Sequence, residues 1–259
     1  MSQTPYSYPF IYDIAFRWRD FEGAVDFLAK AAALSGLEQI DSMIELGCGP
    51  GQYCREFGNR GARAIGLDLQ PEMITYGNQL ETQSPTGCVF LEGDMRMFEL
   101  EEPVDLAVCM MATISLMLTN EDMIRHLRSV HRAVRPGGLY IVEMGHPRDV
   151  FRAGESQQTG WEMEAEGLSV KVEWNTDSSF DPLTEISSGT TRYTVTGPNL
   201  KEVLESPVQE RSIGWGHFQA LVTAAGGWEI VAAYGTLDTA QPFDNSKDSW
   251  RMIPVLRRS

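Results

Sequence analysis

The chain has 259 residues, of which 42% are hydrophobic, which is enough for a large folded core and unlike a disordered chain. Its 36 acidic and 21 basic residues give a net charge of −15, which opposes a broad surface for DNA or bulk RNA. The apolar runs are too short to cross a membrane and the opening MSQTPYSYPF carries no secretory signal, so we expect a cytoplasmic protein without a membrane partner.

The N-terminal segment is rich in aromatic side chains. These are Tyr6, Tyr8, Phe10, Tyr12, Phe16, Trp18 and Phe21. Apolar residues between Ile14 and Leu34 recur at helical spacing, which predicts helices here. We expect residues 1–40 to form a helical lid over a ligand cleft, and packing of the aromatic residues into the core is the alternative interpretation.

Strand-like and helix-like patterns alternate over residues 41–150. The predicted strands are Met43–Leu46, Ala64–Leu69, Val89–Glu92, Val104–Met111 and Leu139–Met144. Helices are predicted after Gln52, after Pro71 and after Thr119, where an acid three residues on completes a capping box. This alternation predicts an α/β fold with a doubly wound, mostly parallel sheet, whose ligands bind outside the carboxyl ends of the strands.

The pattern changes after Val150. Apolar and polar residues alternate with period two over Trp161–Trp174 and Thr184–Val195, which predicts an antiparallel β insertion over residues 151–210. Its first part, residues 152–160, is polar and is expected to be a loop.

Residues 211–259 are expected to return to the core sheet. Helical spacing from Phe218 to Val222 precedes two strand-like runs, Trp228–Tyr234 and Arg251–Leu256. Because no helix separates these runs, we expect them to form an antiparallel hairpin at the edge of the sheet.

The run MIELGCGPG joins the first predicted strand to the first helix. Its glycines, Gly47, Gly49 and Gly51, permit a tight turn and close approach of the backbone to a ligand. The dinucleotide fingerprint would need a further glycine where the chain has Gln52, and no Gly-Lys-Ser/Thr follows, so phosphate recognition is not favoured. Asp68 lies 21 residues after Gly47, a spacing that suits an acid accepting hydrogen bonds from ribose hydroxyls.

With these motifs the chain resembles the class I S-adenosylmethionine-dependent methyltransferases, in their small-molecule branch. The matching stretches are IELGCGPGQY, GLDLQPEMI, EGDM, VDLAVCM and LRSVHRAVRPGGLYIVE, with AAGGWEIVAAYG and DSWRMIPVLRR near the end. The resemblance covers most of the chain except the insertion. It implies a Rossmann-like methyltransferase fold and S-adenosylmethionine as the cofactor.

The resemblance also implies a set of cofactor-binding residues. They are Glu45, Gly47, Gly49, Asp68, Met73, Asp94, Met95 and Met110. Glu45 would lie near the methionine portion, Asp68 would accept from the ribose hydroxyls, and Met73 would pack on adenine. Asp94 would take the adenine amino group, with the Met95 backbone at the ring edge. Helix packing for Met73 and a turn role for Asp94 or Asp68 are the alternatives.

The acceptor side of the site is predicted from position alone. Transfer from a sulfonium is an in-line displacement, which needs alignment and desolvation, and a base only where the nucleophile arrives protonated. His146 follows a strand end and is the first candidate base, and His217 is the second; a structural role is the alternative for both. Further residues expected to line the acceptor site are Tyr12, Trp18, Thr113 and Arg148.

The four cysteines predict neither a metal site nor disulfides. Cys48, Cys54, Cys88 and Cys109 form no CxxC pair. Buried free thiols in a reducing cytosol are therefore expected.

We accordingly predict an enzyme, a monomer or homodimer, that methylates an N or O nucleophile of a small-molecule acceptor. An amine acceptor is compatible with the negative net charge of the chain. An RNA or protein methyltransferase is one alternative, opposed by the net charge and by Met110–Thr113 standing where an NPPY-like motif would be. A protein that binds the cofactor without transferring its methyl group is another, and a nicotinamide enzyme is a third.

Overall fold

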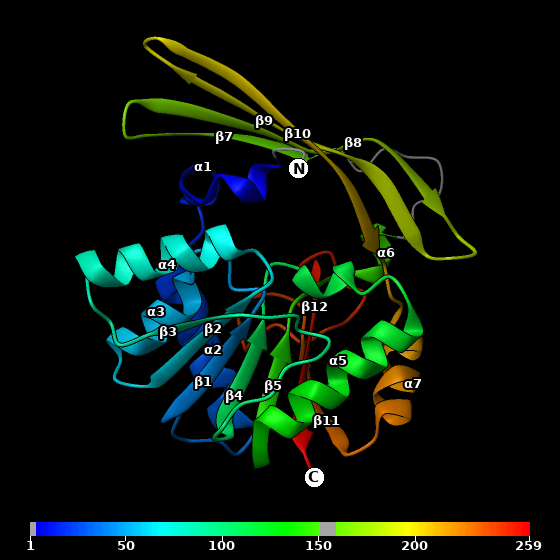
Figure 1. The fold of residues 1–259 in the computed structure, drawn as a ribbon. Coiled ribbons are helices and arrows are strands. Elements are labelled where there is room, and N and C mark those ends of the chain that lie inside the picture. Colours follow the sequence, from blue (N-terminus) through cyan, green and yellow to red (C-terminus); the bar gives the residue numbers. More distant parts are fainter. Residues whose placement is uncertain (1–3, 151–158) are drawn as a thin grey trace.

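Two sheets, one above the other, make up the computed structural model, which describes residues 4–150 and 159–259 (Figure 1). In this part of the chain the larger sheet has eight strands, ordered β11-β12-β5-β4-β1-β2-β3 with β6 paired to β12. Its strands are β1 Ser42–Leu46, β2 Arg63–Asp68, β3 Val89–Glu92, β4 Val104–Cys109, β5 Val134–Val142, β6 Met144–Gly145, β11 Trp228–Tyr234 and β12 Arg251–Arg258. The five strands from β1 through β5 are parallel to their neighbours, and an antiparallel β11–β12 hairpin forms the edge. This arrangement confirms the predicted sheet.

One predicted strand is too long. The apolar run from Val104 to Met111 suggested a strand to its end, but β4 stops at Cys109. Met111 and Ala112 have left-handed backbones, with φ of 57° and 58°, and these turn the chain at the carboxyl edge of the sheet. Such angles are uncommon for residues other than glycine and concentrate at functional sites.

Helices cover both faces of the larger sheet. On one face lie α2 Phe21–Leu34, α3 Gln52–Asn59 and α4 Pro71–Gln83, and on the other lie α5 Asn120–Ala133 and α7 Trp215–Ala225. The α5 helix begins as its capping box predicts, because the Thr119 hydroxyl accepts from the Asp122 N–H at 3.0 Å. No helix among the described residues is long and apolar enough to span a membrane.

The smaller sheet, which we call the roof sheet, extends over the carboxyl edge of the larger one (Figure 1). Its four antiparallel strands are β7 Thr159–Ala165, β8 Leu168–Asp181, β9 Ile186–Gly197 and β10 Leu200–Arg211. This confirms the predicted antiparallel insertion. A loop was expected over residues 152–160, of which residues 152–158 lie outside the described part of the chain. Residues 159 and 160 are the first two residues of β7.

The N-terminal segment packs against the underside of the roof sheet. The helices η1 Pro5–Ser7 and α1 Pro9–Ala15 lie between the two sheets (Figure 1). Ile14 and Phe16 form a separate apolar cluster with Val170 and Tyr193 of the roof sheet. Two segments far apart in sequence therefore cover the carboxyl edge together.

Trp161 joins these two segments directly. Its indole Nε1 donates to the Ala15 carbonyl at 2.6 Å, and its ring lies 5.3 Å from Phe16 and 6.2 Å from Trp18 between centroids. The bond satisfies the last carbonyl of a short helix that has little stability of its own.

We predict that Trp161→Phe loosens α1 without unfolding the larger sheet, because it removes this hydrogen bond and keeps an aromatic ring. Amides of residues 12–15 should exchange hydrogen roughly two- to tenfold faster, as expected for loss of one net hydrogen bond. The control is Trp228→Phe, which removes an indole bond to the Leu127 carbonyl in the lower core. Unchanged exchange in α1 of Trp161→Phe would contradict the assignment.

Candidate functional site

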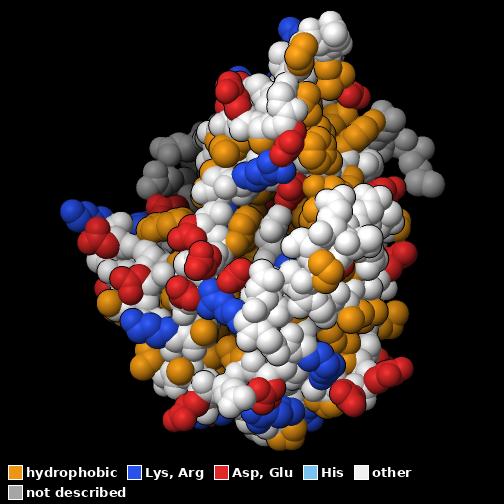
Figure 2. Space-filling model, turned by 90° about the vertical axis from the view of Figure 1, so that its left-hand side faces the viewer, with side chains coloured by type: hydrophobic (Ala, Val, Ile, Leu, Met, Phe, Trp, Pro, Cys, Tyr) orange, Lys and Arg blue, Asp and Glu red, His pale blue; other side chains and the backbone are white. Residues whose placement is uncertain are grey.

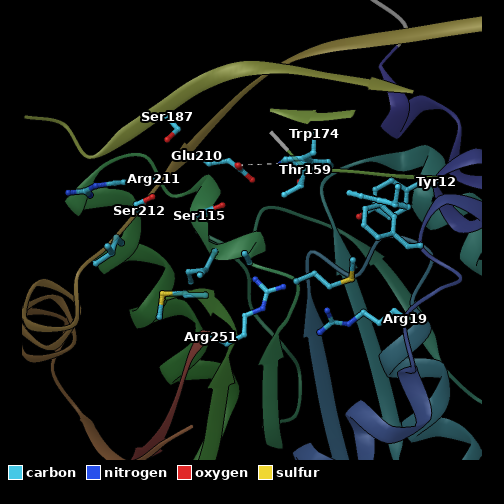
Figure 3. Close-up of a pocket in the computed structure, with 18 of the residues that line it drawn as sticks. Tyr12, Arg19, Ser115, Thr159, Trp174, Ser187, Glu210, Arg211, Ser212 and Arg251 are labelled. Atoms are coloured by element: carbon cyan, nitrogen blue, oxygen red, sulfur yellow. Dashed lines mark hydrogen bonds between the residues drawn. The ribbon is translucent and has the colours of Figure 1, made fainter. Parts of the chain in front are cut away.

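Three adjoining cavities lie at the carboxyl edge of the larger sheet, beneath the roof sheet. The edge cavity, of about 280 Å³, lies over the glycine turn and is lined by Gly47, Gly49, Asp68, Met73, Asp94, Met95 and Arg96 among others. The inner cavity, of about 40 Å³, lies beside Glu45 and Met110. The roof cavity, of about 320 Å³, lies between Arg19 and Arg251 below and Trp174 and Glu210 above (Figure 3). Tyr12 and Met111 line all three, so the cavities meet at these side chains.

The glycine turn presents its backbone to the edge cavity. Gly47, Gly49 and Gly51 all have left-handed φ, of 65°, 53° and 80°, which other residues rarely adopt. A Cβ at Gly47 would lie 2.4 Å from Cγ2 of Thr113. The backbone therefore favours glycine at all three positions, and the close approach of Thr113 requires it at Gly47.

Asp68, at the end of β2, holds this turn in place. Its Oδ2 accepts from the Gly49 N–H at 2.8 Å and its Oδ1 accepts from the Gln70 N–H at 2.9 Å. Burial raises the pKa of Asp68, and these backbone donors oppose that rise. The carboxylate thus orders the turn and lines the edge cavity, so the turn role and the ligand role foreseen for it are compatible.

Asp94 lines the edge cavity together with a basic neighbour that the sequence patterns did not single out. Arg96 donates to it from Nη2 at 2.6 Å and from Nε at 3.0 Å. These hydrogen bonds lower the pKa of Asp94 and keep it ionised. Met73 and Met95 are buried against the same cavity and give it an apolar wall.

Glu45 is buried at the end of β1 and faces the inner cavity. Its Oε2 accepts from the Cys54 N–H, in the first turn of α3, at 2.9 Å. Burial raises the pKa of Glu45 to about 8, so a positively charged group in the inner cavity would stabilise the ionised form.

The floor of the roof cavity is built around Glu143, whose side chain is 0% exposed. Its Oε2 accepts from Arg19 Nη2 at 2.6 Å and from the Met111 N–H at 2.8 Å. Its Oε1 lies 3.2 Å from Arg251 Nε. Glu143 lies in one of the stretches that match the family, but no role was predicted for it, nor for Arg19 and Arg251. The sequence pattern that could have indicated Glu143 is an acidic residue immediately after a buried strand.

Glu210 was also missed, because it lies on a strand of the insertion where no motif was recognised. It lines both the edge and the roof cavities, and its Oε2 accepts from Trp174 Nε1 at 3.4 Å (Figure 3). Burial raises the pKa of Glu210. It is therefore a carboxylate placed where the two larger cavities meet.

The structure contradicts the prediction that His146 is a base. The ring is 2% exposed, its Nδ1 accepts from the Arg148 N–H at 3.1 Å, and its Nε2 donates to the Asp244 carbonyl at 2.9 Å. Both nitrogens are used by the backbone, and His146 lines none of the three cavities. The chain lines the roof cavity as far as Met144 and Gly145, but the His146 ring turns to the segment before β12, where it lies 5.0 Å from the Phe243 ring between centroids.

His217 and Arg148 are likewise structural. His217 contacts Glu185 Oε2 at 2.9 Å and Asn120 Oδ1 at 3.1 Å. Arg148 donates to the carbonyls of Asn245, Ser246 and Ser249, which hold the segment before β12. Neither residue lines the three cavities.

The other residues expected near an acceptor do line a cavity. Trp18 lines the roof cavity, Thr113 the edge and inner cavities, and Tyr12 all three. The expected free thiols are found, since Cys48, Cys54, Cys88 and Cys109 are buried and free.

Comparison with known proteins places a family domain over the core strands. Residues 43–138 match a family model described as a methyltransferase domain. The chain is 30% identical over 107 residues to dTDP-4-amino-2,3,4,6-tetradeoxy-D-glucose N,N-dimethyltransferase of Saccharopolyspora spinosa, covering 41% of each chain. It is 25% identical over 138 residues to dTDP-3-amino-3,4,6-trideoxy-alpha-D-glucopyranose N,N-dimethyltransferase of Streptomyces venezuelae, covering 51% of this chain and 55% of that one. The chain thus spans about half the length of these curated relatives.

The likeness of fold extends much further than that of sequence. A solved S-adenosylmethionine-dependent methyltransferase from Clostridium acetobutylicum superimposes with a TM-score of 0.79 at 14% identity, over 97% of this chain and 98% of that one. Both sheets therefore belong to the Rossmann-like methyltransferase fold.

Because Glu143 pairs with the buried Arg19 and the partly buried Arg251, we predict that Glu143→Gln destabilises the protein strongly. Removing one partner of a buried charge network costs about 3–5 kcal/mol, since the remaining charges stay buried. Denaturant unfolding at neutral pH measures the change. Glu229→Gln is the control, since Glu229 is exposed and pairs with Arg257 at 3.4 Å, and its loss should cost about 1 kcal/mol or less. Equal effects of the two substitutions would refute the role of Glu143.

Proposed function

We propose that this chain, which carries a methyltransferase domain of the class I fold over residues 43–138, methylates a small molecule bound in the roof cavity. The observation that supports this most is the meeting of the edge and roof cavities at Tyr12, Met111 and Glu210. A cofactor in the edge cavity and an acceptor in the roof cavity would share one boundary, where a group can pass between them.

The residues of the edge cavity fit S-adenosylmethionine. The left-handed Gly47 and Gly49 leave the room that a ligand's close approach requires, and Asp68 lies beside them. Asp68 would hold the ribose hydroxyls, Met73 and Met95 the adenine faces, and Glu45 the ammonium group through its ionised form. When bound, this cofactor supplies a methyl group already activated as a sulfonium.

The acceptor is proposed to be small because the roof sheet covers its cavity. A volume of about 320 Å³ lies in the range of small-molecule sites. Figure 2 shows acidic and basic side chains interspersed on one face of the molecule, without the broad basic patch that RNA would favour. These observations support a small metabolite over RNA or protein.

A nitrogen nucleophile agrees with the names of the two curated relatives described above, which are N,N-dimethyltransferases named for dTDP-linked aminosugars. A protonated amine must lose a proton before it can attack. Glu210 is the carboxylate at the junction of the cavities, and burial raises its pKa, which makes the ionised carboxylate a stronger proton acceptor. We therefore assign to Glu210 the role first predicted for His146.

We predict that Asp68→Ala weakens binding of S-adenosylhomocysteine by about tenfold or more, because buried ribose hydroxyls would lose a charged acceptor. Calorimetry measures the affinity. Glu92→Gln is the matched control, because Glu92 pairs with Asp68 in register but is exposed and does not line the edge cavity. If Asp68→Ala binds S-adenosylhomocysteine with wild-type affinity, Asp68 does not hold the ribose hydroxyls.

Turnover tests the proposed function and the role of Glu210 together. Wild-type protein with isotopically labelled S-adenosylmethionine and a panel of amines and alcohols, including dTDP-linked aminosugars, should yield a product heavier by one labelled methyl group. Retained cofactor without any methylated product would instead favour a binding protein.

With an amine acceptor, Glu210→Gln should lower turnover by about a hundredfold or more. Wild-type turnover should fall as the pH drops through the raised pKa of Glu210, since the protonated carboxyl cannot accept a proton. This limb of the pH profile should be absent in Glu210→Gln. Glu205→Gln on the same strand, exposed and paired with Arg192, is the control. A variant at Glu210 that keeps the wild-type rate and profile would exclude it as the base.

A further inference from the structure

Two arginines and one carboxylate leave the floor of the roof cavity with unbalanced charge. Glu143 is the sole acid that contacts Arg19 and Arg251 among the described residues, at 2.6 and 3.2 Å. One negative charge therefore faces two positive ones at a site where the carboxylate is fully buried. Burying an excess charge is costly unless a further partner balances it.

The two guanidinium groups differ in how many hydrogen bonds they donate. Arg19 donates from Nη2 to Glu143 and from Nε to the Tyr53 hydroxyl, both at 2.6 Å. Within the described residues Arg251 makes no hydrogen bond of good geometry: its buried Nε lies 3.2 Å from Glu143 Oε1, but the two atoms form an ion pair without a hydrogen bond. The excess positive charge therefore lies mainly on Arg251.

Arg251 is held in position and directed into the cavity. Its guanidinium lies 4.4 Å from the centre of the Trp250 ring, a cation–π contact that orients the plane. Its side chain is 25% exposed and lines the roof cavity. Figure 3 shows the guanidinium pointing upward from the floor, with Ser115 and Glu210 above it.

The acid on the opposite wall does not neutralise this charge. Glu210 accepts from Trp174 on the roof sheet, and no ion pair joins it to Arg251 in the described structure. Arg211, on the side of the cavity, adds a further cation, paired with Glu185 at 3.1 Å. The cavity thus has a cationic floor and a carboxylate at its junction with the edge cavity.

We propose that Arg251 is the binding residue for an anionic group of the acceptor, a phosphate or a carboxylate. The planar guanidinium can donate two parallel hydrogen bonds to either group, and such bonds are short and strong. With its anion on the floor, the acceptor would extend toward Met111 and Glu210, where the cavities meet. This inference deepens the proposed function and rests on the roof cavity being its acceptor site.

The test is calorimetric titration of the whole protein with pyrophosphate and, separately, with citrate, at constant ionic strength, with and without S-adenosylhomocysteine. Wild-type protein should bind at least one of these anions saturably. Arg251→Gln should weaken that binding by about tenfold or more. Arg125→Gln, which removes an exposed charge on α5, should leave it unchanged.

A second variant tests the proposal independently, in case Arg251→Gln fails to fold. Ser115→Asp leaves the Glu143 contacts in place and adds a negative charge to the cavity wall, so it should also weaken anion binding. Binding of pyrophosphate alone identifies a phosphate-bearing acceptor, and binding of citrate alone a carboxylate-bearing one.

Absence of saturable binding of either anion, or equal binding by wild type and both cavity variants, overturns the proposal. Anion binding at Arg251 in a protein that fails to bind S-adenosylhomocysteine would instead leave the subsite standing and remove the proposed function.

Discussion

The arrangement of the site depends on the contacts that the buried carboxylate of Glu143 makes. It receives Arg19 from the N-terminal segment, the Met111 N–H from the turn after β4, and Arg251 from the last strand. Three parts of the chain that are distant in sequence thus converge on one charge. Because a buried charge is costly without partners, each of these parts is held near the geometry that the site requires.

The roof of the site follows from a second constraint, the need to bury apolar surface. Neither the short α1 helix nor the four-stranded roof sheet has a core of its own, so they form one together around Ile14, Phe16 and Tyr193. The cavity left between this cluster and the larger sheet is enclosed by aromatic side chains, with charges of opposite sign on its floor and at its junction. Shape and charge therefore come from different segments: apolar packing encloses the cavity, and Glu143, Arg251 and Glu210 set its electrostatics.

Several residues of the edge and inner cavities could be predicted because they are local in sequence. Glu45, the glycine turn and Asp68 lie at the ends of two neighbouring parallel strands, and all such ends meet at one edge. The charged residues of the roof cavity could not, because the His146 ring turns from this edge to the segment before β12, where it contacts the Asp244 carbonyl. Glu210 and Arg251 lie in segments that approach the edge only through the folding of the insertion and the last strand.

The sequence by itself determined the alternating α/β order and the glycine turn, because periodicity and turn chemistry act over a few neighbouring residues. The resemblance to a known family added Met73, Asp94 and Met95 of the edge cavity, but neither Arg96 nor Glu210. Only the tertiary structure decided which charged groups face the roof cavity. That choice depends on long-range pairing, in which a buried acid must find its donors wherever the chain brings them. Sequence spacing carries no record of such a pairing between residues as distant as Arg19 and Glu143.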